Sequence, residues 1–298
     1  MRFSIVLGAG GPKAWPFHAG VLEALADNGL APDHAELMIG TSAGAAVATA
    51  TRSGATPGDI IDFITMPPSA AEVAEFRQSF PRSSGDKLRA ALPRAPQLLM
   101  RKGRRGGLGL GVVAAGLLPA GLMPNNLLAR LPGVSIGDRL PDRLWIPAVR
   151  LPDGETVVFG RDEWLEGTTA TEAVQASSAV PWLFQAKSVK GVTYVDGAVD
   201  SPTHADLALG ITPEVVVISS VMTRPGNRVS QLLARRALAA ETEQLEAAGV
   251  RTIVVAADEA AGRLLEGFTQ RTNPTEGRSR GRQIADLAAH LTRAALVT

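Results

Sequence analysis

One turn near residue 40 constrains the fold of this chain more than any other feature. A short apolar run leads into Gly40-Thr41-Ser42-Ala43-Gly44, and small residues follow. This order predicts a buried strand, a sharp turn and a helix, with the Ser42 hydroxyl raised out of the backbone at the helix N-terminus. Gly40 and Gly44 remove the side chains that would clash on either side of the turn. We interpret Ser42 as a nucleophile on a strand-turn-helix elbow, against the simpler alternative of a tight structural turn.

A second glycine-rich turn, residues 8–13, follows an apolar run at the N-terminus and contains Gly10-Gly11-Pro12-Lys13. Backbone N–H groups in such a loop bind an anion, either a dinucleotide pyrophosphate or the oxyanion of an acyl-transfer intermediate. The dinucleotide motif needs a third glycine where this chain has Lys13, and the Gly-Lys-Ser/Thr ending of a P-loop does not occur here. The loop therefore fits an oxyanion hole better, with amides near Gly10 and Gly11 as donors and Lys13 adding positive charge.

An Asp-Gly pair, Asp196-Gly197, stands before Ala198 at the end of a predicted strand. Taken alone, Asp-Gly is usually only a turn. A serine hydrolase needs a base, however, and the four histidines are poorly placed for that role: His18 in the first predicted helix, His34 in a loop, His204 just past the aspartate and His290 in a C-terminal helix. An aspartate that reaches Ser42 directly would make a two-residue catalytic site.

In this order the motifs resemble the patatin-like phospholipase family, which has a glycine-rich oxyanion loop, a G-x-S-x-G serine and a D-G-G/A aspartate. A fourth block, residues 176–184, resembles the A-S-x-A-x-P-x-x-F stretch that precedes the aspartate in that family. The resemblance implies a Ser-Asp dyad in which Ser42 attacks a lipid acyl ester and Asp196 is the general base. It also implies that neither a metal nor an organic cofactor is needed.

The resemblance is incomplete around the oxyanion loop. Lys13 replaces the commoner arginine, Ala14 stands where glycine is usual, and the spacer Trp15-Pro16-Phe17 is one residue longer than usual. These departures concern the geometry of the oxyanion hole and leave the interpretation of the serine unchanged.

Strand-like and helical segments alternate along the chain, which predicts a three-layer α/β fold with a largely parallel central sheet, as in the patatin-like family. The predicted strands are Phe3–Leu7, the run before Gly40, Leu144–Arg150, Thr156–Gly160, Val189–Val195, Val215–Val221 and Thr252–Ala256. The predicted helices are Val21–Asp27, Ala43–Ser53, Thr171–Ser178, Val229–Ala248 and Arg282–Ala295. In such sheets the site forms beyond the carboxyl ends of the strands, where we expect Gly10, Ser42 and Asp196.

Length, composition and charge limit the domain organisation and the binding partners that this chain can have. With 298 residues, 45% of them hydrophobic, the chain can bury a large core, and we expect residues 1–298 to form a single catalytic domain. The net charge of +1 gives no global support for nucleic-acid binding, and the chain has no cysteine for a disulfide. The N-terminal apolar run is too short for a signal peptide, so we expect a cytoplasmic protein. No motif specifies an oligomeric state.

Residues 67–133 interrupt the α/β alternation. Seven basic and no acidic residues occur in 87–105, and 106–129 then carries no charge but many Gly, Leu and Ala. Its glycines, with Pro119 and Pro124, argue against a transmembrane helix. Three interpretations stay open: a cap over an acyl pocket, a face that docks on anionic lipid, or a solvated basic surface beside an ordinary core helix.

Two other functional classes remain at this point. A histidine-dependent α/β-hydrolase would require His204 or His290 to reach Ser42. A non-catalytic lipid-binding or scaffolding protein could keep all of these motifs, because a fold does not fix a function. No motif specifies the head group, the acyl-chain length, the regiochemistry, or hydrolysis as opposed to acyl transfer.

Overall fold

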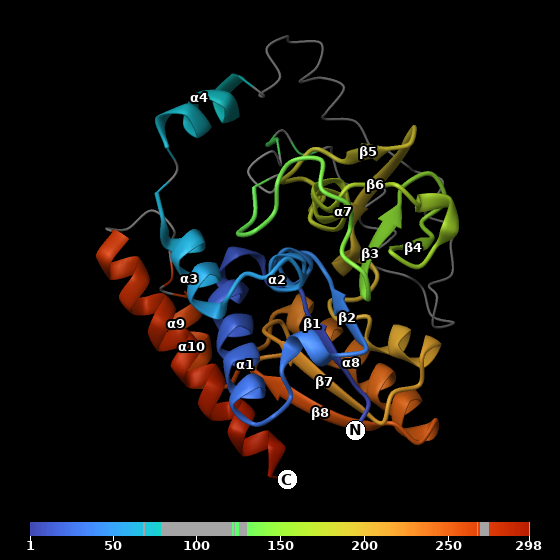
Figure 1. Cartoon of the computed structure of the whole chain (residues 1–298), viewed down its shortest axis with the longest axis vertical. Coiled ribbons are helices and arrows are strands. Elements are labelled where there is room, and N and C mark those ends of the chain that lie inside the picture. The colour runs from blue at the N-terminus through green and yellow to red at the C-terminus, as the bar shows by residue number, and fades with distance from the viewer. Residues whose placement is uncertain are drawn as a thin grey trace.

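The computed structural model describes residues 1–67, 69–78, 121, 123–124, 130–266, 268 and 274–297. A central sheet lies between two sets of helices, with α1, α3 and α10 to one side of it in Figure 1 and α8 to the other. The expected three-layer α/β architecture is confirmed.

The strands are β1 (Phe3–Leu7), β2 (Leu37–Gly40), β3 (Leu144–Arg150), β4 (Thr156–Phe159), β5 (Lys187–Val189), β6 (Val192–Asp196), β7 (Val215–Ser220) and β8 (Arg251–Ala256). The α-helices are α1 (Ala14–Asp27), α2 (Ala43–Arg52), α3 (Pro57–Thr65), α4 (Ala70–Gln78), α7 (Ala170–Ser177), α8 (Val229–Ala247), α9 (Glu259–Glu266) and α10 (Pro274–Leu296). Short 3-10 helices are η1 (Gly11–Lys13), η2 (Pro32–His34), η5 (Glu163–Leu165), η6 (Gly197–Val199) and η7 (Ala205–Gly210).

The sheet is largely parallel, as expected. Its strand order is β5-β6-β3-β2-β1-β7-β8, and β4 also pairs with β3. The five strands from β3 to β8 in this order are parallel, whereas β4 and β6 pair antiparallel with β3, and β5 with β6. The register sets Leu7, which ends β1, beside Gly40, which ends β2. The glycine-rich loop and the elbow therefore leave the sheet side by side, at the carboxyl ends of β1 and β2.

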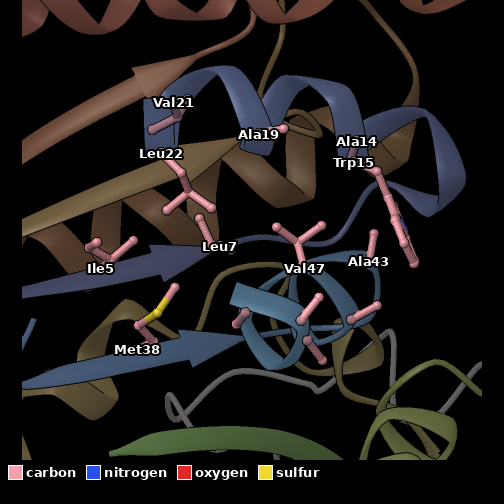
Figure 2. Packing of buried hydrophobic residues seen from close by; sticks show 14 of the residues in the cluster. Ile5, Leu7, Ala14, Trp15, Ala19, Val21, Leu22, Met38, Ala43 and Val47 are labelled. Atoms are coloured by element: carbon pink, nitrogen blue, oxygen red, sulfur yellow. The ribbon is translucent and has the colours of Figure 1, made fainter. Parts of the chain in front are cut away.

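Both faces of the central strands are buried, which explains their continuous apolar sequences. Along β1, Ile5 and Leu7 pack into the cluster that contains α1, α2 and α10, while Val6 belongs to a second cluster with α8 and η7. Figure 2 shows the first cluster, where Leu22 of α1 and Val47 of α2 lie close to Leu7. Burial of Leu7 among these side chains thus anchors the carboxyl end of β1, from which the glycine-rich loop starts.

Helix caps account for two of the boundaries. Thr56 caps α3 in a capping box with Asp59, and Pro57 occupies the first turn, where no N–H partner is required. Thr169 caps α7 through the same arrangement with Glu172. The α7 cap holds the start of the helix that carries Ser177 into the site.

Several predicted boundaries are wrong. Instead of the single strand Val189–Val195, the chain forms the β5–β6 hairpin, because Lys190 (φ 49°) and Gly191 (φ 78°) adopt the left-handed conformations of a two-residue turn. Helix α1 begins at Ala14, well before the predicted Val21, and α10 begins at Pro274. Helices α3, α4 and α9 were not predicted.

Most of the predicted cap, residues 67–133, lies outside the described residues, including the whole basic run 87–105. Of the uncharged run that follows, only residues 121, 123 and 124 are described. Among the described helices, none combines the length and the apolar character that a membrane span requires. The interpretations of this segment stay predictions.

Candidate active site

The elbow forms as the sequence predicts, between β2 and α2. Ser42 has φ 55° and ψ −115°, a strained backbone conformation for a residue with a side chain. A Cβ on Gly44 would lie 1.9 Å from the Leu7 carbonyl oxygen, and one on Gly40 would lie 2.6 Å from the Ala45 Cα. Only glycine fits at these two positions, so the motif is required to place Ser42 at the start of α2.

Ser42 and Asp196, 154 residues apart in the sequence, are in direct contact. The Ser42 hydroxyl donates a hydrogen bond of 2.7 Å to Asp196 Oδ2. The other carboxylate oxygen accepts from the Ala198 amide at 2.8 Å, and the Asp196 amide donates to the Ala179 carbonyl at 3.0 Å. Both side chains are buried. The aspartate is therefore held at its backbone and at one oxygen, with the other oxygen turned to the serine.

Burial raises the pKa of the Asp196 carboxyl from 3.8 to about 6, because the charged form loses its hydration. The hydrogen bonds from Ser42 and from the Ala198 amide, and the nearby His204, favour the charged form and oppose this shift. A carboxyl group with a pKa close to neutrality is a better proton acceptor than an exposed aspartate while still being ionised at pH 7.

Asp196 does not reach the site in the way the sequence suggested. We expected it at the carboxyl end of a parallel strand, but β6 is antiparallel to β3. The register pairs Asp196 with Ala148 of β3, three positions beyond Trp145, which pairs with Ile39 of β2. Ser42 is likewise three residues beyond Ile39. Ser42 and Asp196 therefore lie at the same height along β3, although the chain runs in opposite directions through β2 and β6.

Gly197, the residue after Asp196, lies too close to β3 to carry a side chain. A Cβ at Gly197 would lie 2.5 Å from the Pro147 carbonyl oxygen. The next residue, Ala198, supplies the amide that binds the aspartate. The predicted Asp-Gly turn is thus present, and its glycine lets the chain pass close to β3.

Ser177, at the end of α7, connects the elbow to β3. Its Oγ accepts from the Ser42 amide at 3.0 Å and donates to the Pro147 carbonyl at 2.7 Å. Ser177 falls in the block 176–184, which resembles a motif of the patatin-like family, but the sequence pattern assigned no role to this residue. Because the Ser42 amide is engaged by Ser177, donors for an oxyanion have to come from other backbone groups.

The glycine-rich loop lies beside the elbow. The amides of Gly8 and Ala9 donate to the carbonyls of Ser219 and Pro202, at 2.9 and 2.8 Å. The next two amides, those of Gly10 and Gly11, have no hydrogen-bond acceptor among the described residues.

The glycine-rich loop packs closely against α1 at Gly10 and is open to solvent from Gly11 onward. Gly11 has φ +64°, with open space where a Cβ would be, while a Cβ on Gly10 would meet that of Ala14 at 2.7 Å. Pro12 and Lys13 are exposed in η1. The loop thus offers two neighbouring N–H groups and a lysine at the N-terminus of α1, as an anion site requires.

None of the four histidines hydrogen-bonds to Ser42. His18 is fully buried between Ser219 Oγ (2.7 Å) and the Gly8 carbonyl (2.8 Å), and burial lowers its pKa to about 4. His204 Nδ1 lies 3.2 Å from Thr41 Oγ1, so this histidine contacts the residue that precedes Ser42 in the elbow. The other two, His34 and His290, are exposed. This arrangement does not form the triad of a histidine-dependent hydrolase.

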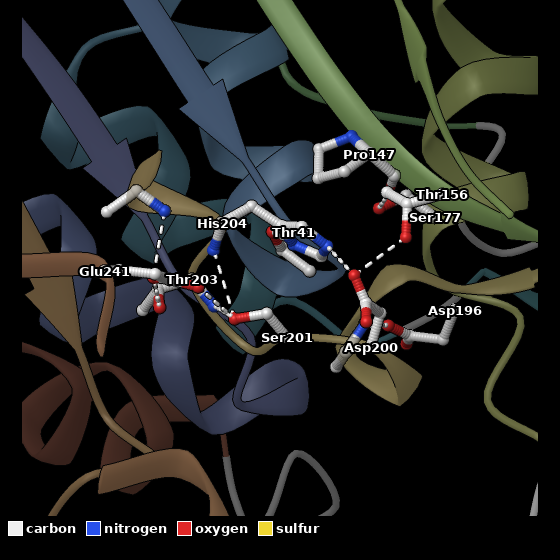
Figure 3. Close-up of polar contacts among 12 residues, drawn as sticks. Thr41, Pro147, Thr156, Ser177, Asp196, Asp200, Ser201, Thr203, His204 and Glu241 are labelled. Atoms are coloured by element: carbon white, nitrogen blue, oxygen red, sulfur yellow. Dashed lines mark hydrogen bonds and ion pairs between the residues drawn. The ribbon is translucent and has the colours of Figure 1, made fainter. Parts of the chain in front are cut away.

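No group of three or more potential metal-ligating side chains occurs in the described part of the chain. Next to Ser42 in the sequence, the Thr41 hydroxyl lies 3.2 Å from the ring of His204, and Ser177 donates to the carbonyl of Pro147; these four residues are labelled in Figure 3.

Comparison with models of protein families identifies the family of this chain. The patatin-like phospholipase model matches residues 5–209. The chain belongs to this family. The matched range contains the glycine-rich loop, the elbow and Asp196, whereas α8 to α10 follow it in the sequence.

Two solved structures resemble this patatin-like chain. VipD from Legionella pneumophila is 15% identical, with a TM-score of 0.45 and coverage of 98% of this chain and 66% of that one. The type III effector protein ExoU is 17% identical, with a TM-score of 0.40 and coverage of 98% and 53%. The chain therefore spans about two thirds of the first protein and about half of the second. A comparison with curated proteins found no match.

Proposed function

We propose that the chain is a serine acyl-ester hydrolase acting on lipids, a phospholipase, lysophospholipase or related lipid acyl hydrolase. The observation that carries this proposal is the 2.7 Å hydrogen bond from Ser42 Oγ to the buried carboxylate of Asp196. A nucleophile and a base in contact, with the base oriented by a third group, are the recurring elements of nucleophilic catalysis. The match to the family model supports lipid as the class of substrate.

The first half-reaction follows from these contacts. Asp196 accepts the hydroxyl proton of Ser42 as Oγ attacks the acyl carbonyl, which forms the Oγ–C bond and places negative charge on the carbonyl oxygen. The free amides of Gly10 and Gly11 would stabilise that charge, and Lys13 adds to the field. Asp196 then returns the proton to the departing alcohol as its C–O bond breaks, leaving an acyl-serine.

The second half-reaction repeats these steps with water. Asp196 takes a proton from the water molecule, whose oxygen attacks the acyl-serine carbonyl. Collapse of the intermediate releases a fatty acid and returns the proton to Ser42 Oγ. No step requires a group beyond the side chains and amides already named.

Release of fatty acid from phospholipid in mixed micelles, measured by mass spectrometry, tests this function. Wild-type protein should release fatty acid, and Ser42→Ala should reduce the rate about 10³-fold or more with the fold intact. Release by neither protein, together with unchanged lipid binding, would favour the non-catalytic lipid-binding alternative. Identical rates for the two would remove Ser42 from the mechanism.

A further inference from the structure

Glu241 is a fully buried carboxylate on α8 that the proposed mechanism does not use. It accepts hydrogen bonds from Ser201 Oγ and Thr203 Oγ1, both at 2.5 Å, and from the Ala205 amide at 2.9 Å. Figure 3 shows the two hydroxyls turned toward it. Short hydrogen bonds to a charged acceptor are the strong kind, and a buried carboxylate is tolerated only with such compensation.

The three donors belong to one short segment, residues 201–205, which follows Asp196 closely in the sequence. Ser201 Oγ also accepts from the amides of Thr203 and His204, at 3.3 Å each. His204 itself has φ 54°, a left-handed conformation that needs support from its surroundings. Glu241 therefore determines the shape of this segment through bonds at three points.

The segment 201–205 in turn contacts both loops of the active site. The Pro202 carbonyl accepts from the amide of Ala9, the residue before the two unpartnered amides of the glycine-rich loop. On the other side, His204 Nδ1 lies 3.2 Å from Thr41 Oγ1, the residue before the nucleophile. One segment thus joins the aspartate, the oxyanion loop and the elbow, and Glu241 is its anchor.

We propose that Glu241 is a positioning residue for catalysis, which holds residues 201–205 so that the glycine-rich loop and the elbow keep their places relative to Asp196. The inference rests on the proposed function for its kinetic consequence. It adds a residue that lies beyond the range matched by the family, 5–209.

Glu241→Gln tests the proposal, because glutamine keeps the volume but offers one carbonyl acceptor where three donors converge. Displacement of catalytic groups by even 1 Å can lower the rate about 10²-fold. We expect kcat for a short soluble ester to fall about that much while KM changes less than about threefold. Leu245→Ala is the matched control, since Leu245 is buried one turn farther along α8 in a purely apolar cluster. It should lower the melting temperature without changing kcat.

A second pair of variants covers the case in which Glu241→Gln fails to fold. Thr203→Val replaces one donor hydroxyl with a methyl group of the same shape, whereas Thr203→Ser keeps the hydroxyl. We expect Thr203→Val to lower kcat and Thr203→Ser to restore it to near the wild-type value. Equal kcat for wild type, Glu241→Gln and Thr203→Val, or an equal loss in Leu245→Ala at matched stability, would overturn the proposal.

Amide NMR of the unliganded protein separates this inference from the proposed function. Glu241→Gln should shift the resonances of Ala9, Gly10 and Gly11, and Leu245→Ala should not. If these shifts occur but wild-type protein hydrolyses no ester, the proposed function fails and the positioning effect survives as structure alone. If Ser42-dependent hydrolysis occurs while the loop resonances and kcat of Glu241→Gln stay unchanged, the positioning role fails.

Discussion

Replacing Asp196 with asparagine should abolish ester hydrolysis. As the pH rises, it should also shift the free energy of unfolding in favour of the variant relative to wild type. The change removes the charge and retains the contacts, since an asparagine Oδ1 can accept from the Ala198 amide and its Nδ2 can donate to Ser42 Oγ. The effect on stability should therefore report mainly on the cost of keeping a charged carboxylate buried at this position.

The magnitude follows from the pKa of Asp196, which burial raises from 3.8 to about 6. Between these two pH values the native state holds a proton that the unfolded state has released, so the free energy of unfolding falls as the pH rises. A shift of about two units corresponds to about 3 kcal/mol, lost from wild type between about pH 4 and pH 7 and constant above it. The Asp196→Asn variant has no titrating group at this position and should not lose this amount.

Urea unfolding of wild type and Asp196→Asn at a series of pH values from about 4 to about 8 measures the effect. The stability difference between the two proteins should move by about 3 kcal/mol in favour of the variant across this range. Asn substitution of the exposed Asp142 controls for the change in net charge. A difference that does not depend on pH, or one that favours wild type more at the alkaline end of the series than at the acidic end, would contradict a raised pKa for Asp196.

Three further predictions concern the groups around the dyad and the basic segment. Ser177→Ala leaves the buried Ser42 amide and Pro147 carbonyl without their partner, so urea unfolding should show a loss of about 1–3 kcal/mol and kcat should fall; unchanged kcat in folded protein would exclude a role for Ser177 in placing the nucleophile. Gly11→Val strains a backbone with φ +64°, so steady-state kinetics should show turnover falling far more than affinity, with Lys13→Ala milder; an unchanged rate would exclude this loop as the oxyanion hole. Reversal of four basic residues to glutamate should weaken binding to anionic vesicles and hydrolysis there, both measured against salt, yet spare a soluble ester; equal loss on both substrates would instead assign the segment to the fold. These four residues are Arg101, Lys102, Arg104 and Arg105.

The local features of the fold and site were predictable from the sequence, because each depends on residues close together in the chain. The elbow is specified by Gly40, Ser42 and Gly44 within one short motif, and β1 and β3 have the predicted bounds. The β5–β6 turn was missed because Lys190 is an unusual residue for a left-handed turn position. Helix α3 was missed because its capping box uses Asp59 in place of the usual Glu or Gln.

Long-range contacts were beyond the reach of sequence patterns. Ser177 and Glu241 are separated from their partners by many residues, 135 between Ser42 and Ser177 and 38 between Thr203 and Glu241. Neither belongs to a spacing rule, since each depends on how helices pack against the sheet. The antiparallel approach of Asp196 likewise follows from the β5–β6 hairpin, which turns the chain back along β3.

Labelling with a serine-reactive fluorophosphonate, followed by peptide mapping, tests whether Ser42 and Asp196 act together as a catalytic dyad. We expect one adduct, on Ser42, whose formation slows as the pH falls through about 6 because Asp196 becomes protonated. Ser42→Ala should take up no label, and Asp196→Asn should take it up at least about 10²-fold more slowly at about pH 8. Labelling of another serine, or labelling of Asp196→Asn at the wild-type rate, would contradict a Ser42–Asp196 dyad.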